Sequence, residues 1–310
     1  MSGFIAIDIG GTQMRAACYP TDGLKPLKIK KISTQHPIES AWDRLVKLVA
    51  AVWPDEGGVE RIGVAAPGPL DPFQGVLFAA PNIPAWVNIP LARLLQDHFD
   101  VPVVMGNDAN LAALGEWKYG AGKGHHHLVY LTISTGIGSG IIVDDRLLLG
   151  TRGLAAELGH ITVLPDGPLC GCGQQGHLEA LASGPSIARW VTGEITEGVL
   201  SSLSKLTVVT TQFVAEAAKS GDILAVRALN RAGTFIGQAL ADILHIFNPT
   251  IVIIGGGVSQ SGALLMDPIQ TAMQYHVMNA HYLDNLTLTT AALGDDTGLL
   301  GALALARQQS

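Results

Sequence analysis

Asp8-Ile9-Gly10-Gly11-Thr12 lies near the start of the chain, and Ser134-Thr135-Gly136-Ile137-Gly138 repeats its pattern of glycines beside a hydroxyl residue. Each of these two glycine turns follows an apolar run of strand type and leads into a second such run. Glycines at a strand end let backbone N–H groups approach an anion without obstruction by a Cβ atom. A single turn of this kind is equally consistent with a simple hairpin, but its recurrence predicts an internal duplication that binds phosphate groups.

Short β-branched runs alternate with longer amphipathic stretches along the whole chain, a pattern typical of an α/β protein. Strands are expected at residues 4–9, 15–19, 62–66, 101–105, 128–133, 140–143 and 250–254. Helices are expected at residues 40–53, 90–99, 108–119 and 222–247, from about 262, and from about 296 with Asp295 as a candidate cap.

The length of 310 residues is enough for two domains with separate apolar cores. A glycine-rich break at residues 120–124 separates the two halves that carry the glycine turns. We therefore expect an N-terminal α/β lobe of residues 1–119, completed by a C-terminal helix at 294–310. The C-terminal α/β lobe would consist of residues 120–293, with a ligand cleft between the two lobes.

The composition excludes several classes of partner. The formal net charge of -7 argues against a general affinity for nucleic acid or anionic membranes. No apolar run reaches the roughly 20 residues of a membrane-spanning helix, and no basic leader precedes the first strand. The three cysteines do not form the pattern of a disulfide framework. The expected location is therefore the reducing cytoplasm.

The glycine turns do not match the other common phosphate-binding motifs. Neither is followed by the Lys-Ser/Thr pair of a P-loop, and the second leads into a strand rather than into the helix of a dinucleotide-binding fold. A third glycine run, Gly255-Gly256-Gly257, lies between an expected strand and an expected helix. Nucleotide binding and simple packing are equally consistent with this run.

Asp108 is the candidate catalytic residue. It lies where the expected strand at 101–105 is followed by a helix, the place at which open α/β sheets bind ligands. A carboxylate there can orient an attacking hydroxyl and accept its proton during phosphoryl transfer. A simple role as helix N-cap is the structural alternative. Asp8, at the end of the first strand, is a candidate ligand for Mg²⁺, and Thr12 offers a hydroxyl donor to the phosphates.

Four potential metal ligands cluster in the second half of the sequence: His160, Cys170, Cys172 and His177. Two sulfur and two nitrogen ligands suit tetrahedral Zn²⁺, and with all four from the protein the ion would be structural. A chance grouping is the alternative, because a C-x-C pair alone is weak. The three histidines at 125–127 are instead expected to form an exposed loop, since adjacent side chains point in different directions.

Together these motifs resemble the ROK family (repressors, open reading frames and kinases), and in particular its ATP-dependent glucokinase-type sugar kinases. The resemblance covers nearly the whole chain. Beyond the two glycine turns and the zinc ligands, it is carried by Ala66-Pro67-Gly68-Pro69, Pro81-Asn82-Ile83 with Trp86, Asn107-Asp108-Ala109-Asn110, Glu157-Leu158-Gly159-His160 and Gly255-Gly256-Gly257.

The resemblance implies a two-lobed, actin-like and ribonuclease-H-like ATPase fold that closes on sugar and ATP. It implies that Asp108 is the general base toward a sugar hydroxyl, normally that on C6, and that ATP, Mg²⁺ and a structural Zn²⁺ are the cofactors. The expected sugar-binding residues are Gly68, Asn82, Asn107, Asp108, Glu157, His160 and Glu179. The expected nucleotide-binding residues are Asp8, Gly10, Gly11, Thr12, Gln13, Thr135, Gly136, Gly256 and Gly257.

The resemblance implies that the substrate is a hexose, and glucose is the one we expect. Mannose, fructose, N-acetylglucosamine and N-acetylmannosamine are alternatives, because kinases for these sugars share most of the residue set, and polyphosphate is an open alternative to ATP. A sugar-sensing regulator without catalysis is a further alternative, since the family contains repressors. Members are commonly dimers or tetramers, so a homodimer or homotetramer is expected.

Two positions depart from the family pattern. His177 stands where the zinc-binding loop of family members usually has a third cysteine. Ala156 stands where family members usually have a glycine, just before the Glu157-Leu158-Gly159-His160 motif, called the glutamate box below. Imidazole replaces thiolate as a zinc ligand, so a Cys₂His₂ site is still expected. Ala156 is expected to change the space beside the sugar.

Overall fold

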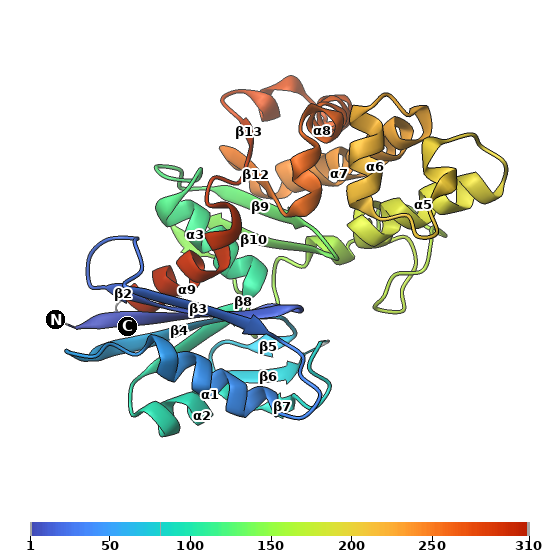
Figure 1. Ribbon diagram of the computed structural model, residues 1–310. Helices are drawn as coiled ribbons and strands as arrows, with labels where there is room; N and C mark the ends of the chain where they lie inside the picture. The colour runs from blue at the N-terminus through green and yellow to red at the C-terminus, as the bar shows by residue number, and fades with distance from the viewer. Residues whose placement is uncertain (1, 81, 309–310) are drawn as a thin grey trace.

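Two five-stranded sheets form the framework of the computed structural model, which describes residues 2–80 and 82–308 (Figure 1). The strand order is β3-β2-β1-β4-β8 in the first sheet and β11-β10-β9-β12-β13 in the second. In both sheets the first three strands in sequence are antiparallel neighbours, and the last two join them in parallel. The duplication expected from the glycine turns is therefore present in the topology.

The strands of the first sheet are β1 (Gly3–Ile9), β2 (Gln13–Pro20), β3 (Lys28–Ser33), β4 (Val59–Ala66) and β8 (Val103–Asn107). Those of the second sheet are β9 (Leu128–Ile133), β10 (Ile137–Val143), β11 (Arg146–Leu147), β12 (Ile251–Gly255) and β13 (Thr287–Thr290). A small third sheet contains β5 (Leu70–Asp71), β6 (Val76–Ala79) and β7 (Val87–Ile89). Each glycine turn joins the first two strands of its five-stranded sheet.

The α-helices are α1 (Ala41–Val52), α2 (Leu91–Phe99), α3 (Asp108–Tyr119), α4 (Leu178–Ala182), α5 (Gly184–Thr196), α6 (Thr211–Lys219), α7 (Ile223–Phe247), α8 (Ala263–His276) and α9 (Thr297–Arg307). Local chemistry sets several of their ends. The Ser40 hydroxyl accepts the Asp43 N–H at 3.1 Å before α1, and Asp222 accepts the Ala225 N–H at 3.0 Å before α7. Asn248, with a positive φ of 42°, ends α7.

Every helix and strand expected from the sequence occurs, with ends shifted by a few residues. The role expected for Asp295 is wrong: this residue lies in the 3-10 turn Gly294–Asp296, and Asp296 precedes α9 without a side-chain capping bond. Residues 309–310 of the expected last helix, and Pro81, lie outside the described residues. Strands β3, β11 and β13, the third sheet and helices α4 to α6 were not anticipated. Within the described ranges, no helix has the length and apolar character needed to cross a membrane.

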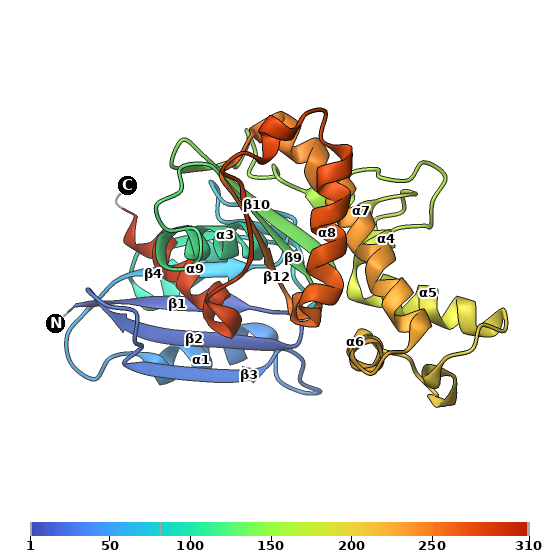
Figure 2. The ribbon, with the colours of Figure 1, turned by 90° about the horizontal axis from the view of Figure 1, so that it is seen from above.

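Helices α3 and α9 lie between the two large sheets (Figures 1 and 2). Helix α9 packs on β1 and β4 of the first sheet, whereas α3 packs on β9 and β10 of the second, and the two helices pack on each other. Glycines bring them close, because a Cβ atom at Gly301 would lie 1.9 Å from the Leu111 carbonyl oxygen and one at Gly115 would lie 2.9 Å from the Gly301 nitrogen. This crossing joins the two sheets.

Replacing Gly301 by alanine is therefore expected to lower the free energy of unfolding by about 2–3 kcal/mol, because the new methyl group must push α3 away. Gly193, in the interior of α5, is the matched control, since a Cβ atom there would have no heavy atom within 4 Å. Gly193→Ala should raise the free energy of unfolding by about 0.5–1 kcal/mol. Denaturant unfolding of both variants measures the difference, and equal stabilities would contradict the close crossing.

Candidate active site

Two cavities lie side by side, and Gly257 and Gln260 contribute to the walls of both. The smaller, of about 400 Å³, is lined by Arg15 of β2, Asp108 of α3 and residues at the start of α9. The larger, of about 830 Å³, is lined by Thr135 of the second glycine turn and by residues of α5 and α6. The smaller cavity thus collects residues of both sheets around Asp108.

The third glycine run combines the two roles that the sequence left open. Gly256 has a positive φ of 82°, and a Cβ atom there would lie 2.3 Å from the Ile133 carbonyl oxygen, so its backbone packs closely on β9. Gly257 borders both cavities, and no heavy atom lies within 4 Å of the place that its Cβ would take. Packing therefore explains Gly256, whereas Gly257 is open to a ligand.

The first glycine turn is a tight connection between β1 and β2. The Gly10 N–H donates to the Gln13 carbonyl at 2.9 Å, and the Thr12 carbonyl accepts the Thr34 N–H at 2.8 Å. A Cβ atom at Gly11 would lie 2.3 Å from the Asn82 side-chain nitrogen, so Asn82 reaches this turn from the segment before β7. Thr12 and Gln13 line neither of the two cavities.

Asp8 lies directly opposite Arg15 in the β1–β2 pairing. Arg15 donates to Asp8 Oδ2 through Nη2 at 2.5 Å and through Nε at 3.1 Å. A Cβ atom at Gly298 would lie 2.7 Å from Asp8 Oδ2, which places the carboxylate against the first turn of α9. Arg15 was not predicted as a site residue, although the hairpin expected around the first glycine turn pairs it with Asp8.

Asn107, and not Asp108, caps helix α3. The Asn107 side-chain oxygen accepts the N–H groups of Ala109 at 3.0 Å and Asn110 at 3.2 Å. Asp108 is the first residue of the helix, and its Oδ1 accepts the Ala109 N–H at 2.8 Å. The alternative role of Asp108 as the cap is therefore wrong. Its carboxyl group faces the smaller cavity.

The Asp108 side chain is open to the cleft on one side and surrounded closely by protein on the others. Burial raises the pKa of Asp108 from 3.8 to about 6, and the Ala109 N–H opposes part of this rise. The negative charges of Asp8 and Glu157 add to the effect of burial in this net value of the pKa. Asp8, Asp108 and Glu157 therefore lie close enough to interact, as the sequence predicted for residues of one site.

Glu157 is held by the residues on either side of it. The buried Ser139 hydroxyl of β10 donates to the Ala156 carbonyl and accepts the Leu158 N–H at 3.1 Å. Ala156 has a positive φ of 68°, a conformation that favours glycine. Burial raises the pKa of Glu157, with His160 lowering it and Glu179 raising it. The box of residues 157–160 thus stands next to Glu179.

Glu179, in α4, contacts the second glycine turn. Its Oε2 accepts the Ile137 N–H at 2.9 Å, and a Cβ atom at Gly136 would lie 2.5 Å from the same oxygen. Its Oε1 lies 3.6 Å from Cys170 Sγ. On the other side of the cleft, a Cβ atom at Gly68 would lie 3.1 Å from the Asn107 side-chain nitrogen. The amide of Asn107 therefore points toward Gly68.

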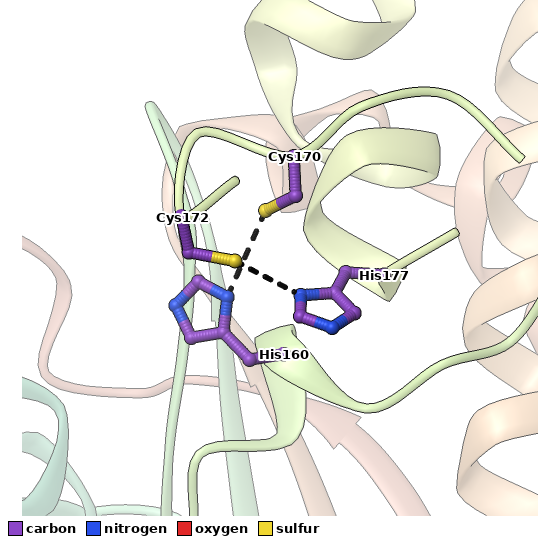
Figure 3. Close-up of side chains that lie close together, drawn as sticks. All are labelled: His160, Cys170, Cys172 and His177. Carbon is purple, nitrogen blue, oxygen red and sulfur yellow. Dashed lines mark hydrogen bonds between the residues drawn. The ribbon is translucent and has the colours of Figure 1, made fainter. Parts of the chain in front are cut away.

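The four expected metal ligands gather in one place, with all their ligand atoms within 4.8 Å of one another (Figure 3). Cys170 Sγ lies 3.7 Å from His160 Nδ1, and Cys172 Sγ lies 3.2 Å from His177 Nδ1. A tetrahedral zinc ion separates its sulfur and nitrogen ligands by roughly 3.5 Å. The donor set and its spacing therefore fit Zn²⁺, with His177 contributing where the family pattern has cysteine.

Other residues singled out by the sequence serve the scaffold. The histidines at 125–127 make separate contacts, to Thr250, Asp145 and Asp144 respectively, and do not converge on one point. Trp86 is buried in the core of the first sheet rather than in the cleft.

Comparison with known proteins extends the similarity over the whole chain. The model of the ROK family matches residues 4–309. A glucokinase of Thermotoga maritima is 34% identical over 98% of this chain and 97% of its own length. A crystal structure of a ROK family glucokinase from Streptomyces griseus, in complex with glucose and AMPPNP, has a TM-score of 0.83 and 36% identity, covering 99% of this chain and 100% of that one.

The chain is also similar to transcriptional repressors of the same family. A xylose repressor of Caldicellulosiruptor bescii is 32% identical over 80% of this chain, but the match covers only 62% of the repressor. The glucokinases, by contrast, match over nearly their full length.

Replacing Ala156 by glycine is expected to raise the free energy of unfolding by about 0.5–1 kcal/mol, because the left-handed conformation costs alanine more than glycine. Ala155 is the control: it has no positive φ, so Ala155→Gly should destabilise the protein instead. Thermal or denaturant unfolding distinguishes the two variants. A loss of stability in Ala156→Gly would show that the methyl group contributes more by packing than it costs in backbone strain.

Proposed function

This chain belongs to the ROK family, and we propose that it is an ATP-dependent hexose kinase that phosphorylates glucose at the C6 hydroxyl. One observation carries the proposal: Asp108, with a raised pKa, faces a cavity bordered by the third glycine run, Gly255-Gly256-Gly257, in a chain that matches glucokinases over nearly its full length. The fold is the two-lobed, actin-like type. The lobes divide as residues 1–119 with the C-terminal helix, and residues 120–293.

The nucleotide spans the two cavities. The larger cavity, with apolar residues such as Val209 and Val258 in its wall, suits a purine ring, and the smaller one suits the phosphates. Gly257 lies where the cavities meet. Of the residues assigned to ATP, Thr135, Gly256 and Gly257 line these cavities. Gly10, Gly11, Thr12, Gln13 and Gly136 line neither cavity, and their assignment to ATP rests on the resemblance to the family.

Asp8 would hold Mg²⁺ with the phosphates. Both hydrogen bonds from Arg15 go to Asp8 Oδ2, so Oδ1 remains to reach a cation or one of its waters. Bound there, Mg²⁺ would neutralise charge on the phosphates. Arg15 itself holds the carboxylate in place.

The sugar lies between Asp108 and the glutamate box. Gly68, Asn82 and Asn107 approach it from the first lobe, and Glu157, His160 and Glu179 approach it from the second. Carboxylate and amide groups suit this task because they bridge adjacent hydroxyl groups. His160 directs Nδ1 toward Cys170, which leaves Nε2 for the sugar.

Asp108 acts as the general base. Its carboxylate accepts the proton of the C6 hydroxyl as that oxygen attacks the γ-phosphorus of ATP, and ADP leaves. A pKa of about 6 keeps the group ionised at neutral pH while making it a stronger base than an exposed aspartate. Its carboxylate thus orients the nucleophile, which is most of what phosphoryl transfer requires from a base.

The chain's His160, Cys170, Cys172 and His177 would hold a structural Zn²⁺. The ion would fix the loop between residues 161 and 177, which otherwise has little regular structure, beside Glu157 and Glu179. Four protein ligands leave no open position for a reacting group. Cysteines that bind Zn²⁺ as thiolates and are not joined by a disulfide are consistent with a cytoplasmic protein.

Turnover with glucose, mannose, fructose, N-acetylglucosamine and N-acetylmannosamine, each with ATP and with polyphosphate, tests the proposal. We expect the highest kcat/KM with glucose and ATP. Asp108→Asn should lower kcat by about 10²–10⁴-fold while leaving glucose binding in place, because the base is lost but the shape is kept. Sugar binding without turnover of any of the five sugars would favour a regulator.

The pH dependence follows from the same residue. Because Asp108 must be ionised to accept a proton, kcat/KM for glucose, which reports the pKa of the free enzyme, should fall as the pH drops through about 6. The raised pKa also means that the folded state disfavours the ionised form, so Asp108 costs stability above pH 6 but not below pH 4. Asp108→Asn should therefore have the higher Tm at pH 7.5, with the gain vanishing near pH 4. An unchanged Tm difference across this range would contradict the raised pKa of Asp108.

Metal analysis of freshly purified protein should find about one zinc per chain. His177→Ala should lose most of the metal and lower the Tm, because one of the four ligands is removed. His126→Ala is the control, since His126 is exposed and contacts only Asp145. Less than about half an equivalent of metal in the unmodified protein would rule out a tightly bound structural ion.

A further inference from the structure

Glu116 is a fully buried carboxylate for which the proposed mechanism has no role. It lies in the last turns of α3, the helix that begins with Asp108. None of the described lysine, arginine or histidine side chains forms an ion pair with it. A buried charge without a cation requires strong hydrogen-bond donors.

The donors come from two segments that are far apart in sequence. Glu116 Oε2 accepts the N–H groups of Ala121 at 2.9 Å and Ala292 at 3.1 Å, and Oε1 accepts that of Leu293 at 2.9 Å. A Cβ atom at Gly120 would lie 2.1 Å from Oε2, so the carboxylate also fills the space beside this glycine. All three bonds are charge-assisted and go to the backbone.

Both segments are places where the chain passes between the lobes. Residues 120–127 connect α3 with β9, the first strand of the second sheet, and residues 291–296 lead from β13 of that sheet to α9. In Figure 2, α3 and α9 lie side by side at this junction. One carboxylate therefore ties together the two connections on which any relative movement of the lobes must turn.

Each of these two helices also meets the proposed reaction site at its first turn. Asp108 begins α3, about 12 Å along the helix axis from Glu116. The first turn of α9 lies against Asp8. A shift of either connection relative to α3 would therefore move Asp108 with respect to the phosphate-binding residues.

We propose that Glu116 is a positioning residue that fastens both interlobe connections to α3 and so fixes the pivot of lobe closure. The inference rests on the proposed kinase function. With the pivot fixed, closing of the lobes brings the acceptor hydroxyl and the phosphates to Asp108 in one defined geometry. Misplacement of reacting groups by about 1 Å can cost roughly 100-fold in rate.

Glu116→Gln tests the proposal because it keeps the size of the side chain but turns one acceptor into an NH₂ group facing backbone N–H donors. We expect kcat with glucose to fall about 10- to 100-fold, with the KM for ATP near the wild-type value, because binding surfaces are intact and only their alignment changes. Small-angle scattering should show a smaller compaction on addition of glucose and AMPPNP than in the wild type.

Asp222→Asn is the matched control. Asp222 also accepts backbone N–H groups, from Ser202 at 2.6 Å and Ala225 at 3.0 Å, but all within the second lobe. The Asp222→Asn variant should have a lower Tm than the wild type, but the same kcat and the same compaction on addition of glucose and AMPPNP. Wild-type kcat and compaction in a folded Glu116→Gln variant would overturn the proposal.

Amide hydrogen exchange in the unaltered protein provides a test that does not depend on the variant folding. The N–H groups of Ala121, Ala292 and Leu293 should exchange slowly both without ligand and with glucose and AMPPNP, because a pivot keeps its bonds as the lobes move. Loss of protection on ligand addition would also overturn the proposal. If the wild type phosphorylated no hexose, the proposed function would fail, and the exchange data would still decide whether Glu116 holds the connections.

Discussion

The close crossing of α3 and α9 is the contact on which the rest of the structure depends. Gly115 and Gly301 let the two helix backbones touch, and no larger residue fits at Gly301 without moving Leu111. Because α9 packs on the first sheet and α3 on the second, this contact joins the two sheets. The cleft forms above it, with Asp108 at the start of α3 and Asp8 against the start of α9.

Function and stability oppose each other in this cleft. Asp8, Asp108 and Glu157 place three carboxylates within electrostatic range, and burial raises the pKa of Asp108 to about 6. This arrangement destabilises the fold at neutral pH, but it produces a base suited to a sugar hydroxyl. The protein compensates locally, with Arg15 paired to Asp8 and backbone N–H groups donating to Asp108 and Glu179.

The features that depend on short-range patterns could be predicted from the sequence. The two glycine turns, the strands beside them and α3 follow from apolar runs and from turn and cap residues. The grouping of the four potential metal ligands follows from their chemistry and spacing in the sequence. Strand β3 was not predicted, because it contains three lysines among six residues and lies at a sheet edge, where the apolar pattern is weak. At Asn107-Asp108 two good capping residues are adjacent, and only the backbone determines that the first one caps. Arg15 could have been found from the predicted hairpin, which pairs it with Asp8. Glu116, by contrast, accepts N–H groups from Ala292 and Leu293, far along the chain, which no local pattern reveals.

The central claim is that Asp108 receives the proton of the sugar's C6 hydroxyl. A structure of this protein with glucose, AMPPNP and Mg²⁺ tests it most directly, because all reacting groups are then present without turnover. A carboxylate oxygen of Asp108 within about 2.6–3.2 Å of the C6 oxygen, with the γ-phosphorus on the opposite side of that oxygen, is the expected result. A glucose molecule whose C6 hydroxyl contacts another residue, or that presents a different hydroxyl to Asp108, would contradict it.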